Sequence, residues 1–279
     1  MKHLNEAKEA KYDEFYTQYI DIENEAPQYI DYFKSQIIYM NCDDPDHSQF
    51  WKYFKDNFER FKLKKIISTF KSDNPYKTEF DGTKETKTKL EGGGDFRSPE
   101  CLAILDEADL IITNPPFSCW ASYYQTIRHK KFLILGTILK AGISPVFEDI
   151  KNSKTFLGTH QPQEFEVGEN YSKFDREENG KRYKKVACCW FQNIERQPKR
   201  SLFQKQKPQK LDHTNIYNFD SVADIDLKYE TIAAPITIFH YDFEKYYRVK
   251  TKLKGSVNNQ AKFQRVILER KKSSQNWNK

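Results

Sequence analysis

Residues 36–70 read QIIYMNCDDPDHSQFWKYFKDNFERFKLKKIISTF. This stretch opens with a β-rich apolar run at 36–42 and closes with another at 65–70, and each run predicts a buried strand. Between them, four phenylalanines recur at helical spacing behind Ser48, which predicts a helix over 49–61. A strand, a helix and a second strand in this order are typical of a βαβ unit, whose two strands lie parallel.

The alternation of strands and helices continues to about residue 195. The predicted strands lie at 110–113, 132–136 and 184–193, and the predicted helices at 99–107 and 119–128. An Asp81-Gly82 turn signal within 76–88 predicts an exposed hairpin, and the polar stretch 160–183 is expected to be mobile. The fold class is therefore expected to be α/β, with a doubly wound Rossmann-like sheet that binds ligands at the carboxyl ends of its strands.

The C-terminal part of the chain has a different charge from the rest. Residues 196–279 hold 18 Lys and Arg against 8 Asp and Glu, a net charge of +10, whereas residues 1–195 carry −4. The stretch 196–210 is basic and glutamine-rich, which predicts a linker. Strands are expected after it near 234–240, 245–250 and 263–269. We therefore expect a main domain over 1–195 and a basic, β-rich part over 196–279 that meets a phosphate-bearing partner; a solvated lysine-rich surface is the alternative.

Composition excludes several classes of protein. The 279 residues are 15% aromatic, which is too rich for a disordered chain. Mean hydropathy is −0.86, and no apolar run approaches the roughly 20 residues that a membrane-spanning helix needs. The N-terminus lacks the apolar core of a secretory signal, so we expect a cytoplasmic protein with no membrane partner. The five cysteines form no C-x-x-C pair, which predicts reduced thiols and no metal site.

The sharpest chemical signal is the tetrapeptide Asn114-Pro115-Pro116-Phe117, which follows the apolar run DLIIT at 109–113. The Asn114 side-chain oxygen and the Pro115 carbonyl can both accept hydrogen bonds from an exocyclic amine, which stabilises the charge that develops when that amine is methylated. The prolines fix the backbone, and Phe117 offers a flat face to a base taken out of its stack. The tetrapeptide therefore indicates an amino-methyltransferase; a proline-rich turn at a strand end, with Phe117 in the core, is the alternative.

Six stretches of the chain carry a resemblance to a known family. They are DEFYT at 13–17, NCDDP at 41–45 with Ser48 and Phe50, GDFRS at 94–98, NPPF at 114–117, WF at 190–191 with Asn193, and PIT at 235–237. In order and spacing they resemble the EcoRI-type adenine-specific DNA methyltransferases, a branch of the S-adenosylmethionine-dependent amino-methyltransferases. The resemblance implies a Rossmann-like methyltransferase sheet, S-adenosyl-L-methionine as cofactor, and methyl transfer to N6 of a flipped adenine in double-stranded DNA.

The same resemblance implies which residues bind the cofactor and the target base. The residues implied on the methionine side of the cofactor are Phe15, Tyr16 and Thr17. Those implied in the first cofactor loop are Asn41, Asp43 and Asp44. Asp95 is implied to accept from the adenine amino group of the cofactor, with Phe96 packed on that ring. The residues implied around the target adenine are Asn114, Pro115, Pro116 and Phe117. Core packing of the aromatic residues and helix capping by the aspartates are the alternative interpretations.

The basic C-terminal part supplies the candidate DNA contacts. Lysines neutralise phosphates, whereas Asn, Gln and Arg can read base edges. The residues expected to contact DNA are Lys199, Arg200, Lys252, Lys254, Asn258, Lys262 and Arg265.

Three functions remain open from the sequence. The first is a site-specific DNA adenine N6-methyltransferase that works as a monomer. It would act beside a restriction endonuclease on the same site without a stable complex, or as an unpartnered or phage methylase. The second is methyl transfer to RNA or to a glutamine amide of a protein. The third is a catalytically inactive relative that only binds DNA.

Overall fold

The computed structural model describes residues 15–168, 171, 173–195, 199–205, 207–212, 214–253, 256–257, 260–261 and 265–272. It has two compact units. The first is drawn from Met1–Thr137 and Gly158–Arg196, and the second from Ile138–Leu157 and Gln197–Lys279. The change of unit at Arg196 falls next to the boundary expected from the charge pattern, but a segment from the middle of the chain also belongs to the second unit. No helix in the described ranges has the length and apolar character that crossing a membrane requires.

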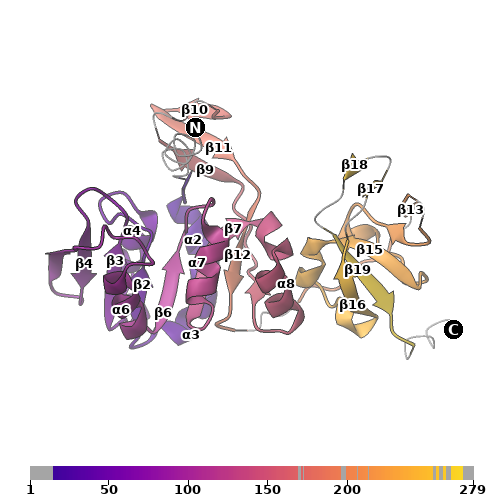
Figure 1. Cartoon of the computed structure of the whole chain (residues 1–279), viewed down its shortest axis with the longest axis horizontal. Coiled ribbons are helices and arrows are strands. Elements are labelled where there is room, and N and C mark those ends of the chain that lie inside the picture. The colour runs from indigo at the N-terminus through magenta and orange to yellow at the C-terminus, as the bar shows by residue number, and fades with distance from the viewer. Residues whose placement is uncertain are drawn as a thin grey trace. The chain divides into compact units, whose positions relative to one another are not determined.

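The first unit is built on a mixed sheet (Figure 1). In spatial order its strands are β5 (Glu85–Lys89), β4 (Tyr76–Phe80), β3 (Lys65–Thr69), β2 (Ile37–Met40), β6 (Leu110–Thr113), β7 (Lys131–Thr137) and β12 (Cys188–Gln192). The central strands β3, β2, β6 and β7 run parallel. The β4–β5 hairpin and β12 pair antiparallel with their neighbours. The α/β class and the exposed hairpin predicted from the sequence are confirmed.

Two of the helices in this unit begin at the capping residues that the sequence predicts. The helices are α2 (Tyr19–Glu25), the 3₁₀ turn η1 (Ala26–Tyr29), α3 (Ile30–Phe33), α4 (Gln49–Asp56), α5 (Phe58–Phe61), α6 (Pro99–Glu107) and α7 (Trp120–Ile127). The Ser48 hydroxyl accepts from the first free N–H groups of α4, and the Ser98 hydroxyl does the same for α6. The single helix predicted over 49–61 is wrong, because Asn57 interrupts it and donates from its side chain to the Tyr53 carbonyl at 2.9 Å.

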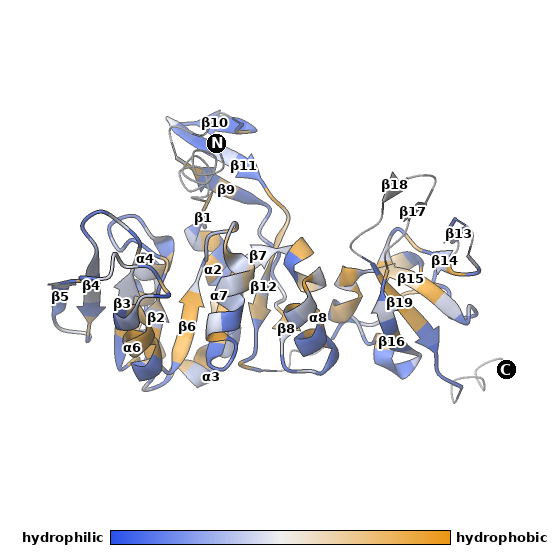
Figure 2. Ribbon diagram, viewed as in Figure 1, coloured by the Kyte–Doolittle hydropathy of each residue, from blue (hydrophilic) through white to orange (hydrophobic). Residues whose placement is uncertain are grey.

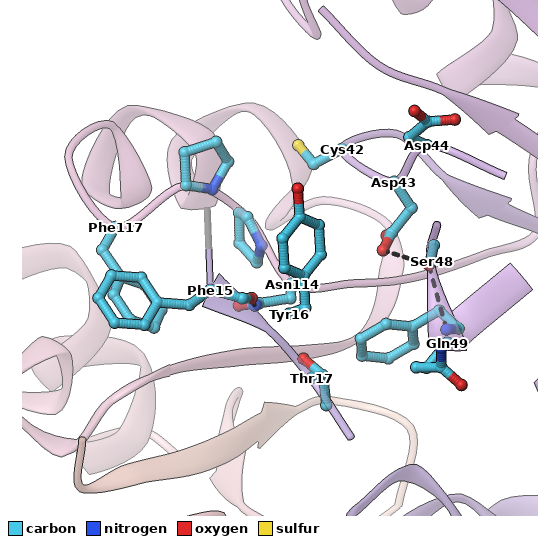
Figure 3. Close-up of a pocket in the computed structure, with 13 residues that line it drawn as sticks. Phe15, Tyr16, Thr17, Cys42, Asp43, Asp44, Ser48, Gln49, Asn114 and Phe117 are labelled. Carbon is cyan, nitrogen blue, oxygen red and sulfur yellow. Dashed lines mark hydrogen bonds between the residues drawn. The ribbon is translucent and has the colours of Figure 1, made fainter. Parts of the chain in front are cut away.

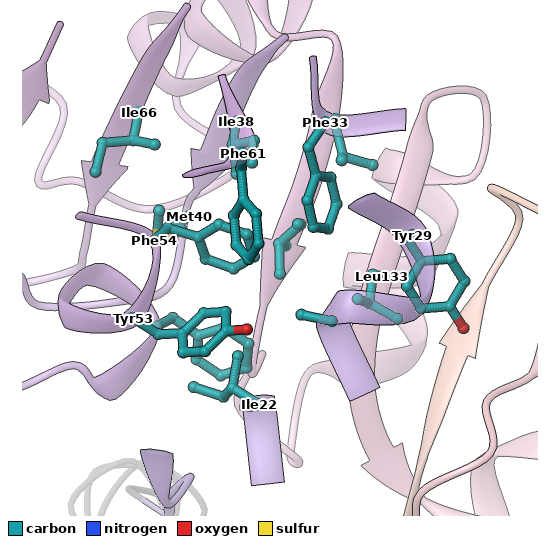
Figure 4. Close-up of a cluster of buried hydrophobic side chains, with 14 of the residues drawn as sticks. Ile22, Tyr29, Phe33, Ile38, Met40, Tyr53, Phe54, Phe61, Ile66 and Leu133 are labelled. Atoms are coloured by element: carbon teal, nitrogen blue, oxygen red, sulfur yellow. The ribbon is translucent and has the colours of Figure 1, made fainter. Parts of the chain in front are cut away.

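Helices cover both faces of the parallel strands. On one face, Ile38 and Met40 of β2 belong to a cluster with Phe54 of α4 and Ile22 of α2 (Figure 4). On the opposite face, the Thr69 hydroxyl at the end of β3 meets Cys101 of α6 at 3.7 Å. Each fully buried ring or aliphatic side chain contributes about 2–3 kcal/mol by leaving water. This two-sided burial explains why the strands read as unbroken apolar runs (Figure 2).

A second, smaller sheet belongs to the same unit. In spatial order its strands are β1 (Phe15–Tyr16), β9 (Glu164–Val167), β11 (Lys181–Lys185) and β10 (Arg176–Glu178), all antiparallel. The described residues of the stretch 160–183, for which the sequence predicts a mobile segment, thus include β9, β10 and the start of β11. Asn179 and Gly180 join β10 to β11 with φ angles of 51° and 75°, the geometry of a tight type I′ hairpin turn. In Figure 1 this sheet stands beyond the upper edge of the main sheet, toward which β6 points.

The second unit is β-rich, as the sequence predicted. Its elements are η2 (Ile138–Gly142), α8 (Ser144–Lys151), β8 (Phe156–Leu157), β13 (Gln209–Lys210), β14 (Tyr217–Asn218), η3 (Val222–Asp224), β15 (Thr231–Pro235), η4 (Ile236–His240), η5 (Phe243–Lys245), β16 (Tyr247–Lys252), β17 (Ser256–Val257), β18 (Gln260–Ala261) and β19 (Arg265–Arg270). Five of the strands form a sheet in the order β13-β14-β15-β19-β16. The strand predicted at 234–240 is wrong beyond Pro235, because the residues that follow form the 3₁₀ helix η4. At the end of this helix, Nδ1 of His240 lies 3.2 Å from the Thr237 carbonyl oxygen.

Candidate active site

A pocket lies at the carboxyl ends of the parallel strands in the first unit (Figure 3). Its walls come from β1, from the loop between β2 and α4, and from the tetrapeptide that follows β6. The lining residues are Phe15, Tyr16, Thr17, Cys42, Asp43, Asp44, Ser48, Gln49, Phe50, Asn114, Pro115, Pro116 and Phe117. The chain leaves β2 toward β3 on one side and leaves β6 toward β7 on the other. Open α/β sheets bind their ligands at such a reversal of strand order.

Three stretches singled out in the sequence converge in this pocket. They are Phe15–Thr17, Asp43-Asp44 and Asn114–Phe117. Sequence reasoning missed Cys42, Ser48, Gln49 and Phe50 as lining residues. Ser48 and Phe50 belong to the stretches that carry the resemblance, but the resemblance implied no site role for them. A helix that begins at the sheet edge brings its first turn to the site.

Asn114 is held by both its backbone and its side chain. Its Nδ2 donates to the Phe15 backbone carbonyl at 2.6 Å, and its backbone N–H donates to the Asp43 carboxylate. The Oδ1 atom is buried and has no hydrogen-bond partner within the described part of the chain. Asn114 therefore presents an acceptor without a partner in a pocket wall. Buried polar atoms in native proteins usually have a hydrogen-bond partner, so this one indicates a place for a bound donor.

Asp43 joins the loop after β2 to the end of β6. Its carboxylate accepts from the Ser48 hydroxyl at 2.7 Å and from the Thr113 hydroxyl. Burial raises the pKa of Asp43 to about 6, against the opposing effect of hydrogen bonds from Thr113, Ser48 and the Asn114 N–H. Asp43 thus holds the two loops together, and its oxygens are already engaged. Asp44, its half-buried neighbour, also lines the pocket.

Aromatic side chains close one end of the pocket. The rings of Phe15 and Phe117 stack with centroids 5.1 Å apart and an interplanar angle of 25°. Phe165 of β9 meets both rings edge-on, and Tyr171 packs edge-on against Phe15. This cluster fixes β1 over the tetrapeptide, since edge-to-face and stacked pairs add about 0.5–1.5 kcal/mol each beyond area burial.

Three residues predicted to bind the cofactor lie outside the lining of this pocket. Asn41 is buried, and its Oδ1 accepts from the Tyr123 hydroxyl. The Asp95 carboxylate forms a two-pronged ion pair with Arg97 at 2.8 and 2.7 Å, and this pair lowers the pKa of Asp95 to about 2. Phe96 is buried edge-on against Tyr123. Asn41 nevertheless keeps a buried Nδ2 atom that has no hydrogen-bond partner among the described residues.

A second, more open pocket adjoins the first. It shares Tyr16, Thr17 and Gln49 with it and extends to the small sheet. The other residues around it are Gln18, Tyr19, Asp46, His47, Glu166, Lys181 and Tyr183. Thr17 borders both pockets, and its buried hydroxyl oxygen has no hydrogen-bond partner among the described residues.

The predicted DNA contacts of the second unit divide into three groups. Lys254, Asn258 and Lys262 lie outside the described residues. Lys199 pairs with Glu244, and Lys252 donates to the Gly142 carbonyl at 2.9 Å. Arg200 is exposed.

Arg265 does not have the placement expected of a DNA contact. The residue is buried, and its guanidinium donates to the Phe219 carbonyl and, at 3.2 Å, to Asp220. Burial lowers the pKa of Arg265 while Asp220 partly compensates. The DNA contact predicted for this residue is therefore withdrawn, because the side chain ties β19 to the loop after β14.

The cysteines and acidic residues do not form a metal centre in the described part of the chain. No group of three or more His, Cys, Asp or Glu there is arranged to hold a metal ion. None of the five cysteines, which all lie within the described residues, forms a disulfide. Burial raises the pKa of Cys42, which lines the pocket, and the nearby Asp43 adds to this effect, so its thiol is not activated as a nucleophile.

The chain is similar in sequence to known methyltransferases. The chain is 34% identical over 317 aligned residues to the Type II methyltransferase M.EcoRI of Escherichia coli, with 97% of each chain covered. It is 36% identical to M.MgeORF184P of Mycoplasma genitalium, over 70% of this chain and 65% of that one. It is also 31% identical to M.MpnI of Mycoplasma pneumoniae, over 70% and 66%. No solved structure matches. The family model described as adenine-specific methyltransferase EcoRI matches residues 3–88 and 71–279, and this chain belongs to that family.

Proposed function

We propose that this chain is a site-specific DNA-methyltransferase that transfers a methyl group from S-adenosyl-L-methionine to N6 of an adenine flipped out of double-stranded DNA. The family and the names of its Type II relatives support DNA methylation. One observation carries the adenine chemistry. Asn114, at the start of an Asn-Pro-Pro-Phe tetrapeptide, places a buried and unpartnered acceptor in a pocket at the carboxyl edge of the sheet.

The proposal includes a doubly wound, Rossmann-like arrangement of the first unit. Its parallel core has helices on both faces, and the order in which strands are added to the sheet reverses between β2 and β6. Both features are typical of that arrangement.

Residues of β1 and of the loop between β2 and α4 are proposed to bind the cofactor. We propose that Phe15, Tyr16 and Thr17 contact its methionine side and that Asp44 accepts from its polar groups. The orphaned Thr17 hydroxyl supports this assignment, since it needs a partner that the described chain does not supply. Asn41 and Asp43 in the first cofactor loop, and Asp95 with Phe96 at the cofactor's adenine, stay predictions. Asn41 Nδ2 is buried without a partner in the described chain, and a carboxylate paired with one arginine keeps further acceptor sites. When bound, the cofactor supplies a methyl group on a positively charged sulfur.

The residues around the target amine act as acceptors and as a platform. Asn114 Oδ1 and the Pro115 carbonyl accept from the two N6 hydrogens, which turns the nitrogen lone pair toward the methyl group. With the methyl donor bound, N6 would take the methyl group and would release one proton to water. Phe117 supports the extruded base by stacking. The two prolines keep both acceptors in place before the substrate arrives.

The basic second unit is proposed to hold the DNA backbone. Its charge of +10 favours a polyanion, and Arg200 is a described cation on its surface. As in a Type II system, the chain would mark sites that a separate endonuclease cuts, without a stable complex between the two.

The decisive experiment compares the wild-type protein with Asn114→Ala. Each is incubated with S-adenosylmethionine and unmethylated genomic DNA, which is then digested to nucleosides and examined for N6-methyladenine by mass spectrometry. Cofactor affinity is measured in parallel by calorimetry. We expect N6-methyladenine from the wild type only, with cofactor binding retained in the variant.

Two other outcomes point to the alternatives. Cofactor binding without DNA methylation would direct the search to RNA and to protein glutamine amides. Absence of both cofactor binding and methylation would identify a DNA-binding relative without catalysis.

A further inference from the structure

We infer that the backbone carbonyl of Phe15 orients the side-chain amide of Asn114, so that its oxygen and not its nitrogen faces the target amine. This inference rests on the proposed function and adds to it a positioning group outside the tetrapeptide. It also implies that the tetrapeptide of this chain works with Asn and not with Asp at its first position.

The chemistry of the contact decides which way the amide turns. The Asn114 amide lies 2.6 Å from the Phe15 carbonyl oxygen. A backbone carbonyl only accepts hydrogen bonds, so the amide must turn its NH₂ group to it. The amide is planar, and Oδ1 therefore occupies its other branch, where it is buried and unpartnered in the described chain. An acceptor in that state is costly until a donor arrives, and the substrate amine is such a donor.

The position of the Phe15 carbonyl is itself fixed by the small sheet. β1 pairs antiparallel with β9, with Phe15 opposite Val167 and Tyr16 opposite Glu166. Gln18 extends the attachment by donating from its side chain to the Glu164 carbonyl at 3.0 Å. The stacked and edge-on contacts of the Phe15 ring complete it. The small sheet thus acts on the reaction through one hydrogen bond to Asn114.

A carboxylate at position 114 would break this arrangement. It offers acceptors to the target amine, yet it has no proton to donate to Phe15, and two oxygens 2.6 Å apart repel each other. A protonated carboxyl restores the original pattern, because its O–H donates to Phe15 and its other oxygen accepts from the amine. The variant Asn114→Asp should therefore need a proton that the wild type does not need.

The titratable groups that line the pocket favour the protonated form of an aspartic acid at position 114. The titratable groups facing the site are Cys42, Asp43 and Asp44 from the loop after β2, and Tyr16 from β1. Glu166 of β9 lies opposite Tyr16 in the strand register, and Lys181 balances its charge at 2.8 Å. The first four can be neutral or negative but never positive, so they disfavour a new carboxylate among them.

The test measures single-turnover methylation of DNA from pH 5.5 to 8.5 for the wild type, Asn114→Asp and Asn114→Ala. At pH 8, Asn114→Asp should be slower than the wild type by roughly 100-fold, on the scale of losing one preorganised polar contact to a transition state. As the pH falls, the ratio of its rate to the wild-type rate should rise at least about tenfold, the change that one protonation confers per pH unit. The Asn114→Ala rate should stay at background over the whole pH range, since alanine cannot regain the contact.

A matched control comes from a second asparagine of the same unit. Asn193 donates from Nδ2 to the Lys130 carbonyl at 2.8 Å and accepts from the Phe132 N–H at 2.8 Å, away from the pocket. The variant Asn193→Asp disturbs an equivalent amide without touching Phe15. Its rate ratio should not rise on acidification as that of Asn114→Asp does.

The wild-type protein provides a measurement that does not depend on how the variant folds. In asparagine-labelled protein, NMR should show one side-chain proton of Asn114 protected from exchange with water by the Phe15 carbonyl. Wild-type speed for Asn114→Asp at pH 8, a flat rate ratio for a folded variant, or a freely exchanging Asn114 amide would each overturn the inference. None of these outcomes touches the proposed function, which fails only if the wild type does not methylate adenine in DNA.

Discussion

The ring of Phe15 lies stacked on the ring of Phe117, with 5.1 Å between the centroids and 25° between the planes. Phe15 belongs to the N-terminal strand, and Phe117 ends the tetrapeptide after β6. The stack covers one face of the Phe117 ring, so a base in the pocket would have to use the other face. The stacking of the target base on Phe117 is a prediction that substitution of this ring tests.

Replacing Phe117 by Leu should weaken catalysis through loss of stacking. Stacking of a base on an aromatic ring contributes about 1–3 kcal/mol, so kcat/KM should fall by roughly 5- to 150-fold. Phe117→Tyr should retain most of the activity because the ring remains. The measurement is initial-rate methylation of a mapped site, together with 2-aminopurine fluorescence at the target position to report base extrusion. Equal activity of the Leu and Tyr variants would contradict the stacking role.

The buried Asp43 should make stability depend on pH in an unusual direction. Its pKa is raised to about 6 in the folded protein, above the value of about 3.9 for an unfolded chain. Between these two values the folded state binds more protons than the unfolded state, so this group lowers the free energy of unfolding as the pH rises from about 4 to 6. A shift of two units corresponds to about 3 kcal/mol.

Asp43→Asn should therefore become more stable relative to the wild type as the pH rises. Urea unfolding at pH 4 and pH 7.5 should show the difference in unfolding free energy moving by about 2–3 kcal/mol in favour of the variant. The negative charge of Asp44 adds to the raised pKa of Asp43, so Asp44→Asn should weaken the pH dependence of the wild type without removing it. A constant difference between Asp43→Asn and the wild type would show that Asp43 does not hold a proton in the folded protein.

Much of the first unit could be predicted because its signals are local. Apolar runs mark β2, β3, β6 and β7, and Ser48 and Ser98 mark the helix starts. A parallel arrangement of those strands then brings their carboxyl ends together. That topology predicts that Asp43-Asp44 and Asn114–Phe117 meet at the pocket. The place of Phe15–Thr17 was implied only by the family resemblance, because β1 belongs to the small sheet.

The contacts that decide the role of each side chain could not be predicted, because they join distant parts of the chain. Nothing in the sequence near Asn114 shows that its amide meets the carbonyl of Phe15, 99 positions earlier. Arg265 was counted with the DNA-binding cations, but its partner Asp220 is 45 positions away. The β10–β11 hairpin is a different case, since its Asn179-Gly180 turn signal was present and the polar composition of the flanking strands masked it.

Arg200 and Lys199 should differ in their effect on DNA binding. Arg200 is exposed, whereas Lys199 is paired with Glu244 and only 12% of its side chain is accessible. If Arg200 contacts a phosphate, Arg200→Ala should lower the slope of log affinity against log salt by about 0.9, the value for one phosphate contact. Lys199→Ala should leave this slope unchanged. Fluorescence anisotropy with a DNA duplex at several salt concentrations measures both, and equal slopes for all three proteins would argue against a phosphate contact at Arg200.

The glycine triplet before Asp95 offers a test of close backbone packing. Gly93 and Gly94 both adopt positive φ angles, 72° and 69°. A Cβ on Gly93 would meet nothing within 4 Å, whereas a Cβ on Gly94 would lie 2.0 Å from the Phe70 carbonyl oxygen, at the end of β3. Gly93→Ala should therefore cost only the backbone strain of about 1–2 kcal/mol. Gly94→Ala should cost more by at least another 1–3 kcal/mol, because the backbone of β3 must move. Urea denaturation of the two variants measures the difference, and equal losses of unfolding free energy would show that the loop before Asp95 does not pack against β3.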